Sequence, residues 1–136
     1  MAPEPAAGQT AGAEALRAGL QRDLTAAMKA RDPDAVAALR TAIAAIGNAE
    51  AVAAPGRNPA ATSAHVAGAH SGLGAAEAAR RELASSDLHA ILRGLIAEHS
   101  READRYDALV QPGAAQRLRR QARVIAAYLP PEDTGR

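Results

Sequence analysis

The sequence predicts an all-α fold, a small bundle of four main helices built on an N-terminal helical hairpin. Three observations support this prediction. Apolar residues recur at helical spacing in four segments, alanine is the most common residue, and no segment has the pattern of a strand. The expected helices span residues 13–30, 33–51, 85–110 and 114–128.

The first two helices are expected to form an antiparallel hairpin. Their apolar residues recur every three or four positions, so each set lies on one helical face. The two sets are Leu16, Leu20, Leu24 and Met28, then Val36, Leu39, Ile43 and Ile46. Between them, Asp32 is a favourable N-cap, and Pro33 suits the first helical position because its missing N–H costs nothing there. The short turn therefore ends one helix and starts the next.

The third and fourth helices are also delimited by their sequence. The third starts at Ser85 or Ser86, with Asp87 placed favourably near the positive end of the helix dipole. Gln111-Pro112-Gly113 ends it, and Pro130-Pro131 ends the fourth helix. The residues expected to face the core are Leu88, Ile91, Leu92, Leu95, Ile96, Ala103, Tyr106 and Val110, then Leu118, Ala122, Ile125 and Leu129.

The remaining segments lack a sustained apolar period. We expect residues 1–12 to be a disordered tail, residues 53–75 to be a long flexible loop, and residues 131–136 to be loose. Residues 75–81 are expected to add a short helical turn. The chain is therefore interpreted as one helical domain over residues 13–130, with the loop as an insertion.

Composition narrows the possible functions. The 136 residues carry 16 Lys and Arg against 15 Asp and Glu, so a net charge of +1 gives no overall bias towards nucleic acid. The absence of cysteine excludes disulfides, thiol catalysis and thiolate metal sites. The N-terminus lacks the basic start and apolar centre of a signal peptide, and we expect no apolar run near the ~20 residues that span a bilayer. A cytoplasmic location without membrane contact is expected.

Several motifs resemble the GatB/YqeY family. The run DLTAAMKARD over residues 23–32, then Leu39-Arg40 and Asn48-Ala49-Glu50, is similar to the family's opening. RELASSDL over residues 81–88 is similar to the entry into its third helix, and Tyr128-Leu129-Pro130 to its Tyr-Leu-Pro signature. Relatives continue past this signature into a second small helical domain, so the resemblance covers only their N-terminal helical part.

The resemblance implies a role with tRNA. The family includes the tail of the B subunit of the glutamine-dependent tRNA amidotransferase, which grips tRNA while the chemistry happens elsewhere. The associated activity is that of a carbon–nitrogen ligase with glutamine as amide donor. Two departures weaken the match: Ala97 and His99 stand where relatives have basic residues, and Gln121-Ala122 where they have Glu-Ile.

Six arginines are the candidate RNA-binding residues, because several phosphate contacts supply most sequence-independent affinity. They are Arg40, Arg101, Arg105, Arg117, Arg119 and Arg120. The alternative for those after residue 100 is a solvated helix face, partly paired with Glu98, Glu102 and Asp104. For Arg40 the alternative is a stem that covers the core and a head that pairs with Glu50 or Asp23.

No catalytic, cofactor or metal site is predicted. Glu50 has no second carboxylate at a spacing suited to acid–base catalysis, so a structural polar contact is expected for it. His65 and His70 lie in the expected loop, and the ten-residue spacing of His89 and His99 puts them on different helical faces. No nucleophilic triad or phosphate-binding glycine loop is present.

The leading prediction is a non-catalytic, GatB/YqeY-like helical module that contacts tRNA or another RNA. The alternative is a protein-interaction adaptor or a homodimerising helical bundle that binds no RNA. A third interpretation, a weak ligase subunit, has no residues of its own to support it. The sequence does not name the RNA or protein partner.

Overall fold

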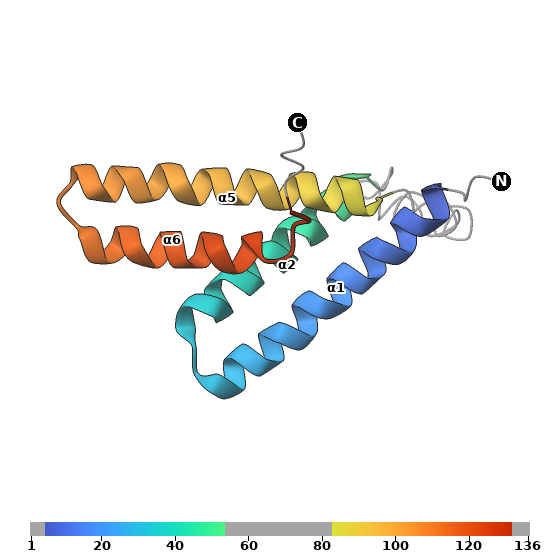
Figure 1. Cartoon of the computed structure of the whole chain (residues 1–136), viewed down its shortest axis with the longest axis horizontal. Coiled ribbons are helices and arrows are strands. Elements are labelled where there is room, and N and C mark those ends of the chain that lie inside the picture. The colour runs from blue at the N-terminus through green and yellow to red at the C-terminus, as the bar shows by residue number, and fades with distance from the viewer. Residues whose placement is uncertain (1–4, 54–82, 132–136) are drawn as a thin grey trace, which may run out of the picture.

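The protein forms four helices in a computed structural model that describes residues 5–53 and 83–131, with side chains described for residues 12–52 and 83–131 (Figure 1). The helices are α1 (Pro5–Ala30), α2 (Pro33–Ala53), α5 (Ser85–Ala108) and α6 (Pro112–Ala126). The predicted all-α bundle of four main helices is confirmed. The expected loop, from residue 54 on, and the residues predicted to form a turn at 75–81 lie outside the described residues, as do residues 132–136.

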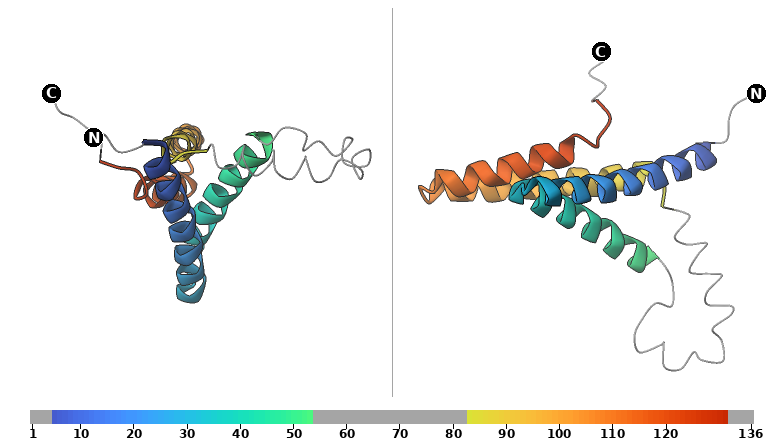
Figure 2. Two further views of the ribbon diagram at one scale, coloured as in Figure 1. Left: turned by 90° about the vertical axis from the view of Figure 1, so that its right-hand side faces the viewer. Right: turned by 90° about the horizontal axis from the view of Figure 1, so that it is seen from below.

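Two helical hairpins pack across each other. Helices α5 and α6 run antiparallel and stay side by side along their length (Figure 1). Helices α1 and α2 meet at their turn, and α2 then leads away from α1 towards its C-terminal end (Figure 2). Helix α6 packs on α2, and α1 also contacts α5. The core lies where the hairpins cross.

The core is lined largely by alanine. Of the thirteen buried apolar residues in the described part of the chain, seven are alanines. The largest fully buried side chains are those of Leu20, Leu88, Leu92 and Ile125, which come from three helices. Small side chains let helix axes approach closely but remove little apolar surface from water.

Two residues expected in the core are exposed. Met28 is 50% exposed and Val110 is 83% exposed. Met28 lies in the last turn of α1, and the lower end of the α1–α2 hairpin projects away from α5 and α6 (Figure 1). Val110 lies at the opposite end of the other hairpin, beyond its last helical turn. The spacing places Met28 on the correct face, but no helix extends far enough to cover it. Val110 lies in the turn after α5, so helical spacing does not place its side chain.

The helix boundaries differ from the prediction at five places. Two of them are the ends of α5 at Ala108 and of α6 at Ala126, each two residues earlier than expected. Helix α1 begins at Pro5 rather than residue 13, so residues 5–12, expected to be disordered, are helical. Alanine favours helix and proline suits a first helical position, which favours this longer helix. Helix α2 runs to Ala53, two residues further than expected. Helix α6 begins at Pro112 rather than residue 114, again with proline in the first turn.

Both hairpins are closed by the same backbone motif. At the first turn, Asp32 N–H donates to the Ala27 carbonyl over 3.1 Å, and Arg31 N–H donates to the Met28 carbonyl over 3.2 Å. This pair of bonds is the Schellman motif, which requires a left-handed residue after the helix. Arg31 is that residue, with φ of 56°.

The second turn repeats the pattern. Gln111 N–H donates to the Tyr106 carbonyl over 2.8 Å, and Val110 N–H donates to the Asp107 carbonyl over 3.0 Å. Val110 takes the left-handed conformation, with φ of 58°. Glycine usually occupies this position, and a β-branched residue there is strained.

Side chains help to start two of the helices. The Asp32 carboxylate accepts a hydrogen bond of 3.2 Å from Ala35 N–H in the first turn of α2, as predicted for an N-cap. The Asp87 carboxylate accepts one of 2.9 Å from Ala84 N–H, next to the start of α5 at Ser85. The predicted start of this helix and the role of Asp87 near its N-terminus are confirmed, although the N-cap residue itself is Ala84.

One segment contradicts the expectation that no apolar run approaches membrane-spanning length. Pro33–Val52 of α2 is 20 residues long with a mean hydropathy of 1.3, enough by length and composition to cross a bilayer. The high value comes from alanine, isoleucine and valine, which occupy twelve of the twenty positions. Leu39 and Ile46 of this segment are buried against the other helices, and 22% of the segment is buried in the fold.

Candidate nucleic-acid interface

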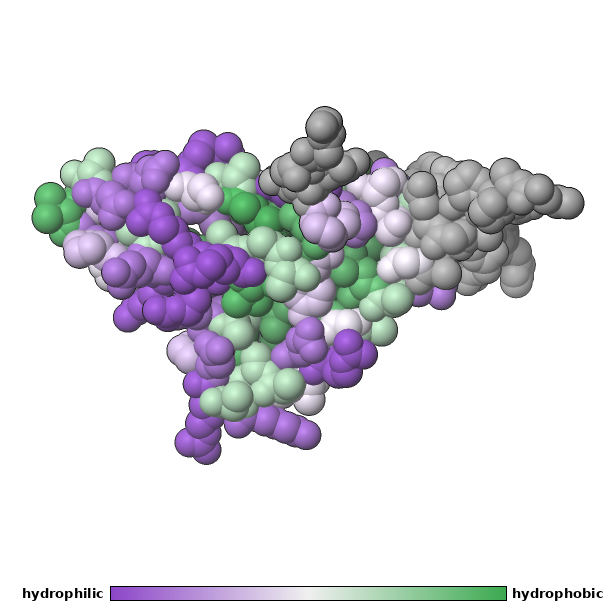
Figure 3. Space-filling model, viewed as in Figure 1, coloured by the Kyte–Doolittle hydropathy of each residue, from purple (hydrophilic) through white to green (hydrophobic). Residues whose placement is uncertain are grey.

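Helix α6 is the most basic element of the described structure. Its fifteen residues include four arginines and no acidic residue: Arg117, Arg119, Arg120 and Arg123. The buried side of the helix consists of Ala115, Ala122 and Ile125. None of the arginines lies on that side, so their head groups reach neighbouring helices or the surface. Hydrophilic residues cover much of the molecular surface around α6 (Figure 3).

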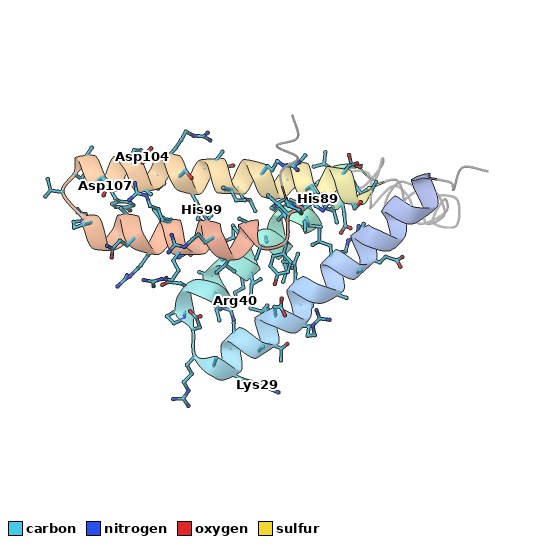
Figure 4. The ribbon with its side chains drawn as sticks, in the orientation of Figure 1. Lys29, Arg40, His89, His99, Asp104 and Asp107 are labelled. Carbon is cyan, nitrogen blue, oxygen red and sulfur yellow. The ribbon has the colours of Figure 1, made fainter. Side chains whose placement is uncertain are left out.

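Arg119 connects α6 to α5. Its guanidinium donates to Asp107 over 2.6 Å and to Asp104 over 2.9 Å. The hydrogen bonds to Asp107 and Asp104 raise the pKa of Arg119 above its ordinary value. Figure 4 shows both aspartates near the end of the α5–α6 hairpin. Both of these partners belong to the facing helix, and the RNA contact expected of Arg119 stays a prediction.

Arg120 connects α6 to α2. It donates to the Asp34 carboxylate, which also lies 3.5 Å from the Gln121 side-chain nitrogen. Asp34 is only 9% exposed and lies in the first turn of α2, where the helix dipole favours a negative charge. Arg120 therefore has a structural partner, although its own side chain is 53% exposed.

Arg105 pairs within its own helix. Its guanidinium lies 3.2 Å from Glu102, one turn earlier on α5, and its side chain is 74% exposed. Exposed pairs of this kind contribute little to stability. The predicted alternative of a solvated helix face partly paired with acidic residues is confirmed for Arg105–Glu102 and for Arg119–Asp104.

Three predicted contact residues remain exposed. Arg40, Arg101 and Arg117 have no ion pair with any residue that the structure describes, and they belong to α2, α5 and α6. Figure 4 shows Arg40 on the part of α2 beside α6. The six arginines thus do not act as one set: two connect helices, one pairs locally and three are available to a ligand.

The partners predicted for Arg40 in its structural interpretation are wrong. Glu50 pairs with Arg17 of α1 over 2.5 Å. Asp23 accepts a hydrogen bond from the Tyr128 hydroxyl and lies 3.8 Å from Arg22. Ten residues separate Arg40 from Glu50 on one helix, which is about 15 Å along the axis and beyond side-chain reach.

Arg123 was left out of the predicted contact set. It is exposed in the last turn of α6, and no ion pair joins it to a described residue. Arg117, Arg120 and Arg123 are spaced three residues apart, which places them along one side of the helix. We call these three residues the α6 basic edge. The three-residue spacing was the sequence signal that could have identified Arg123.

A hollow between α1 and α2 was not predicted from the sequence. It has a volume of about 150 Å³ and is lined by Arg17, Leu20, Gln21, Ile43, Ile46, Gly47 and Glu50. The Arg17–Glu50 ion pair lies at this hollow and joins the two helices. The predicted structural polar contact of Glu50 is thereby confirmed. The Arg17 Nε atom is buried and has no hydrogen-bond partner among the described residues.

Tyr128 connects the two hairpins. Its hydroxyl, just beyond α6, donates to Asp23 of α1. Burial, together with this hydrogen bond, raises the pKa of Tyr128 above its ordinary value. Because this ring is partly buried and its hydroxyl is bonded, it is poorly suited to stack on a base.

The described residues contain no group of three or more His, Asp or Glu side chains placed to hold a metal ion. His89 and His99 lie apart on α5 (Figure 4), and His99 Nδ1 is 2.8 Å from the Leu95 carbonyl oxygen. His65 and His70 lie outside the described residues. No known family model, curated protein or solved structure matches the chain.

Proposed function

We propose that the protein is a non-catalytic helical module that binds structured RNA through phosphate contacts made by the α6 basic edge, Arg117, Arg120 and Arg123. The main support is that α6 combines four arginines with no acidic residue, and that Arg117 and Arg123 are exposed without an ion pair in the described structure. Guanidinium groups suit phosphate because they can donate two parallel hydrogen bonds.

The composition favours contact with the backbone of the RNA over contact with its bases. Readers of single-stranded RNA stack bases on aromatic side chains. This chain has no Phe or Trp and two Tyr, of which Tyr128 is bonded to Asp23. Phosphate contacts carry no sequence information, so affinity is expected to depend on RNA shape and salt more than on sequence.

Transfer RNA is the first ligand to test, because of the resemblance to the amidotransferase tail. In the role we propose, the module holds tRNA for a glutamine-dependent carbon–nitrogen ligase whose chemistry is carried out by other subunits. The proposal requires no cofactor. The predicted cytoplasmic location stays a prediction.

The test is tRNA binding by fluorescence anisotropy at several salt concentrations. The double variant Arg117→Glu/Arg123→Glu changes the basic edge and leaves the Arg119 and Arg120 ion pairs in place. It should weaken binding to all tRNAs alike and flatten the salt dependence by roughly 0.7–0.9 log units per lost phosphate contact. Circular dichroism should show unchanged helicity, since glutamate is a good helix former.

A matched control has the same change in charge. Arg22→Glu/Lys29→Glu alters two exposed cations of α1, and Figure 4 shows Lys29 at the end of α1 next to the turn. This control should bind nearly as the unchanged chain does. Equal weakening by both double variants would mean that only net charge matters. Absence of tRNA binding by the unchanged chain at low salt would exclude the proposed function.

A further inference from the structure

The α6 basic edge contains one arginine that is held in place and two that are not. Arg120 donates through Nη1 to the Asp34 carboxylate of α2. Arg117 and Arg123 form no ion pair with a described residue. The Arg120 side chain is nevertheless 53% exposed, so its guanidinium reaches the surface of the molecule. The middle residue of the edge is therefore both anchored and accessible.

Anchoring uses only part of the Arg120 guanidinium. This group has five N–H donors arranged as a planar fork. Nη1 is bonded to Asp34, and neither Nε nor Nη2 has an acceptor among the described residues. These two nitrogens form the other edge of the fork, which can donate two parallel hydrogen bonds to a phosphate. Arg120 can thus bind a phosphate without releasing Asp34.

Asp34 is suited to hold an arginine without competing for the ligand. Its side chain is 12% exposed, so an approaching phosphate meets the guanidinium before the carboxylate. It lies in the first turn of α2, where the partial positive charge of the helix N-terminus offsets part of its negative charge. Its second oxygen lies 3.5 Å from the Gln121 side-chain nitrogen. The carboxylate is therefore fixed in place, and its charge is partly compensated by its own helix.

The neighbouring arginine has the opposite arrangement. Arg119 donates through a single nitrogen, Nη2, to both Asp104 and Asp107. The side chains of these aspartates are 77% and 47% exposed. Two exposed carboxylates around one guanidinium leave an excess of negative charge, which repels a phosphate. A single, shielded carboxylate thus distinguishes Arg120 from Arg119, although the two residues are adjacent in the sequence.

We propose that Asp34 is a positioning residue for RNA binding and holds Arg120 in the orientation that contacts a phosphate. A free arginine loses rotamer freedom when it binds, and an arginine already ordered by a buried partner loses less. Arg117 and Arg123 provide the unrestrained contacts about one helical turn before and after it. This inference rests on the proposed function, because it concerns the same phosphate-binding edge.

The positioning can be measured on the chain alone, without RNA. Nuclear magnetic resonance order parameters of the arginine Nε–H groups should be higher for Arg120 than for Arg117 and Arg123. Asp34→Ala should lower the value for Arg120 to that of the other two. Equal order parameters for the three arginines in the unchanged chain would overturn the inference.

The second measurement is tRNA affinity by fluorescence anisotropy, for which positioning and charge predict opposite signs. Asp34→Ala removes a negative charge, so charge alone would tighten binding. Loss of positioning should instead weaken binding roughly two- to tenfold, the range for ordering one long side chain. Asp34→Asn keeps an oxygen acceptor for Arg120 and should retain more affinity than Asp34→Ala. Unchanged or tighter binding by Asp34→Ala would contradict the positioning role.

Glu50→Ala is the matched control. It removes the other carboxylate of α2, with the same change in net charge, and it also breaks an ion pair between helices, that of Glu50 with Arg17. Glu50 lies about 24 Å from Asp34 along the helix axis, so the α6 basic edge is unaffected. This variant should bind tRNA at least as tightly as the unchanged chain. Equal weakening by Glu50→Ala and Asp34→Ala would mean that lost stability, and not lost positioning, is the cause.

A double-mutant cycle tests whether Asp34 acts through Arg120. When Arg120→Ala is already present, Asp34→Ala should no longer weaken binding, because no guanidinium remains to be positioned. Circular dichroism should show that all variants are helical at the assay temperature. If Asp34→Ala weakens binding equally in both backgrounds, this inference fails and the proposed function stands. If the unchanged chain binds no tRNA at low salt, both fail.

Discussion

At the α1–α2 turn the left-handed residue is Arg31 and the N-cap is Asp32, whereas at the α5–α6 turn these positions hold Val110 and Gln111. The backbone hydrogen bonds of the two turns are the same. The side chains are not: Asp32 caps the next helix, while Gln111 makes no side-chain cap. Both turns thus hold a non-glycine residue at positive φ, but only the first has a side-chain cap and only the second has a β-branched residue there.

The difference shows that backbone bonds and helix packing are enough to close a hairpin. Helices α5 and α6 stay in contact along their length, and Arg119 adds ion pairs between them. Their turn can therefore tolerate a strained valine. Helices α1 and α2 diverge, so their turn has less help from packing and contains residues suited to it.

The largest effect is expected from core residues rather than from either turn. Leu39 of α2 is 2% exposed, while Leu109 at the second turn is 63% exposed. Leu39→Ala should lower the free energy of unfolding by ~2–5 kcal/mol, and Leu109→Ala by less than ~0.5 kcal/mol. Urea denaturation followed by circular dichroism at low protein concentration measures both. Similar losses of stability in the two variants would mean that the Leu109 side chain is packed in solution.

The next largest losses of stability are expected from breaking the ion pairs between helices. Asp34→Ala removes a buried acceptor of Arg120 and should cost ~1.5–3 kcal/mol, the range for hydrogen bonds that involve a charged group. Asp107→Ala is the control, because Arg119 keeps Asp104 and the site is exposed. That control should cost under ~1 kcal/mol. Equal losses of stability in thermal melts of the two variants would contradict this prediction, which is based on the different burial of the two ion pairs.

Relaxing the second turn should stabilise the monomer. Val110→Gly removes a left-handed penalty of ~1–2 kcal/mol, part of which is offset by the greater freedom of glycine in the unfolded chain. A net gain of about 0.5–1 kcal/mol in unfolding free energy is expected. Arg31→Gly should gain less, because arginine is not β-branched. A loss of stability in Val110→Gly would show that the valine side chain is supported by the fold.

The smallest effect should come from giving the second turn the cap of the first. Gln111→Asp places a carboxylate where Asp32 stands in the α1–α2 turn. A new N-cap bond to α6 should add about 0.5 kcal/mol, the low end of the capping range. Differential scanning calorimetry can resolve the corresponding small rise in melting temperature. No rise at a pH where aspartate is ionised would mean that the backbone at Gln111 holds the side chain away from α6.

The fold was largely predictable because helical periodicity depends on local sequence. The spacing of Leu20, Leu39, Leu88 and Ile125 identified side chains that are buried in the structure. The same rule failed for Met28, since periodicity gives the face of a helix but not how far the neighbouring helices extend. It failed for Val110 because α5 ends at Ala108 and Val110 lies in the turn that follows. The left-handed turn at Val110 has no sequence signal, because glycine is the usual indication of that conformation.

The candidate interface was less predictable because charge pairing depends on packing. Arg119 and Arg120 look alike in sequence to Arg117 and Arg123. Only the arrangement of α5 and α2 around α6 gives two of them carboxylate partners. The hollow likewise depends on the angle between α1 and α2, which no local pattern encodes.

The alanine-lined core has a consequence for the response to temperature. Unfolding raises the heat capacity in proportion to the apolar surface it exposes. With seven alanines among the thirteen buried apolar residues described, that surface is small. The curve of stability against temperature should therefore be broad and shallow, with cold unfolding displaced to lower temperature. The protein would then keep a modest but nearly constant stability over a wide range of temperatures.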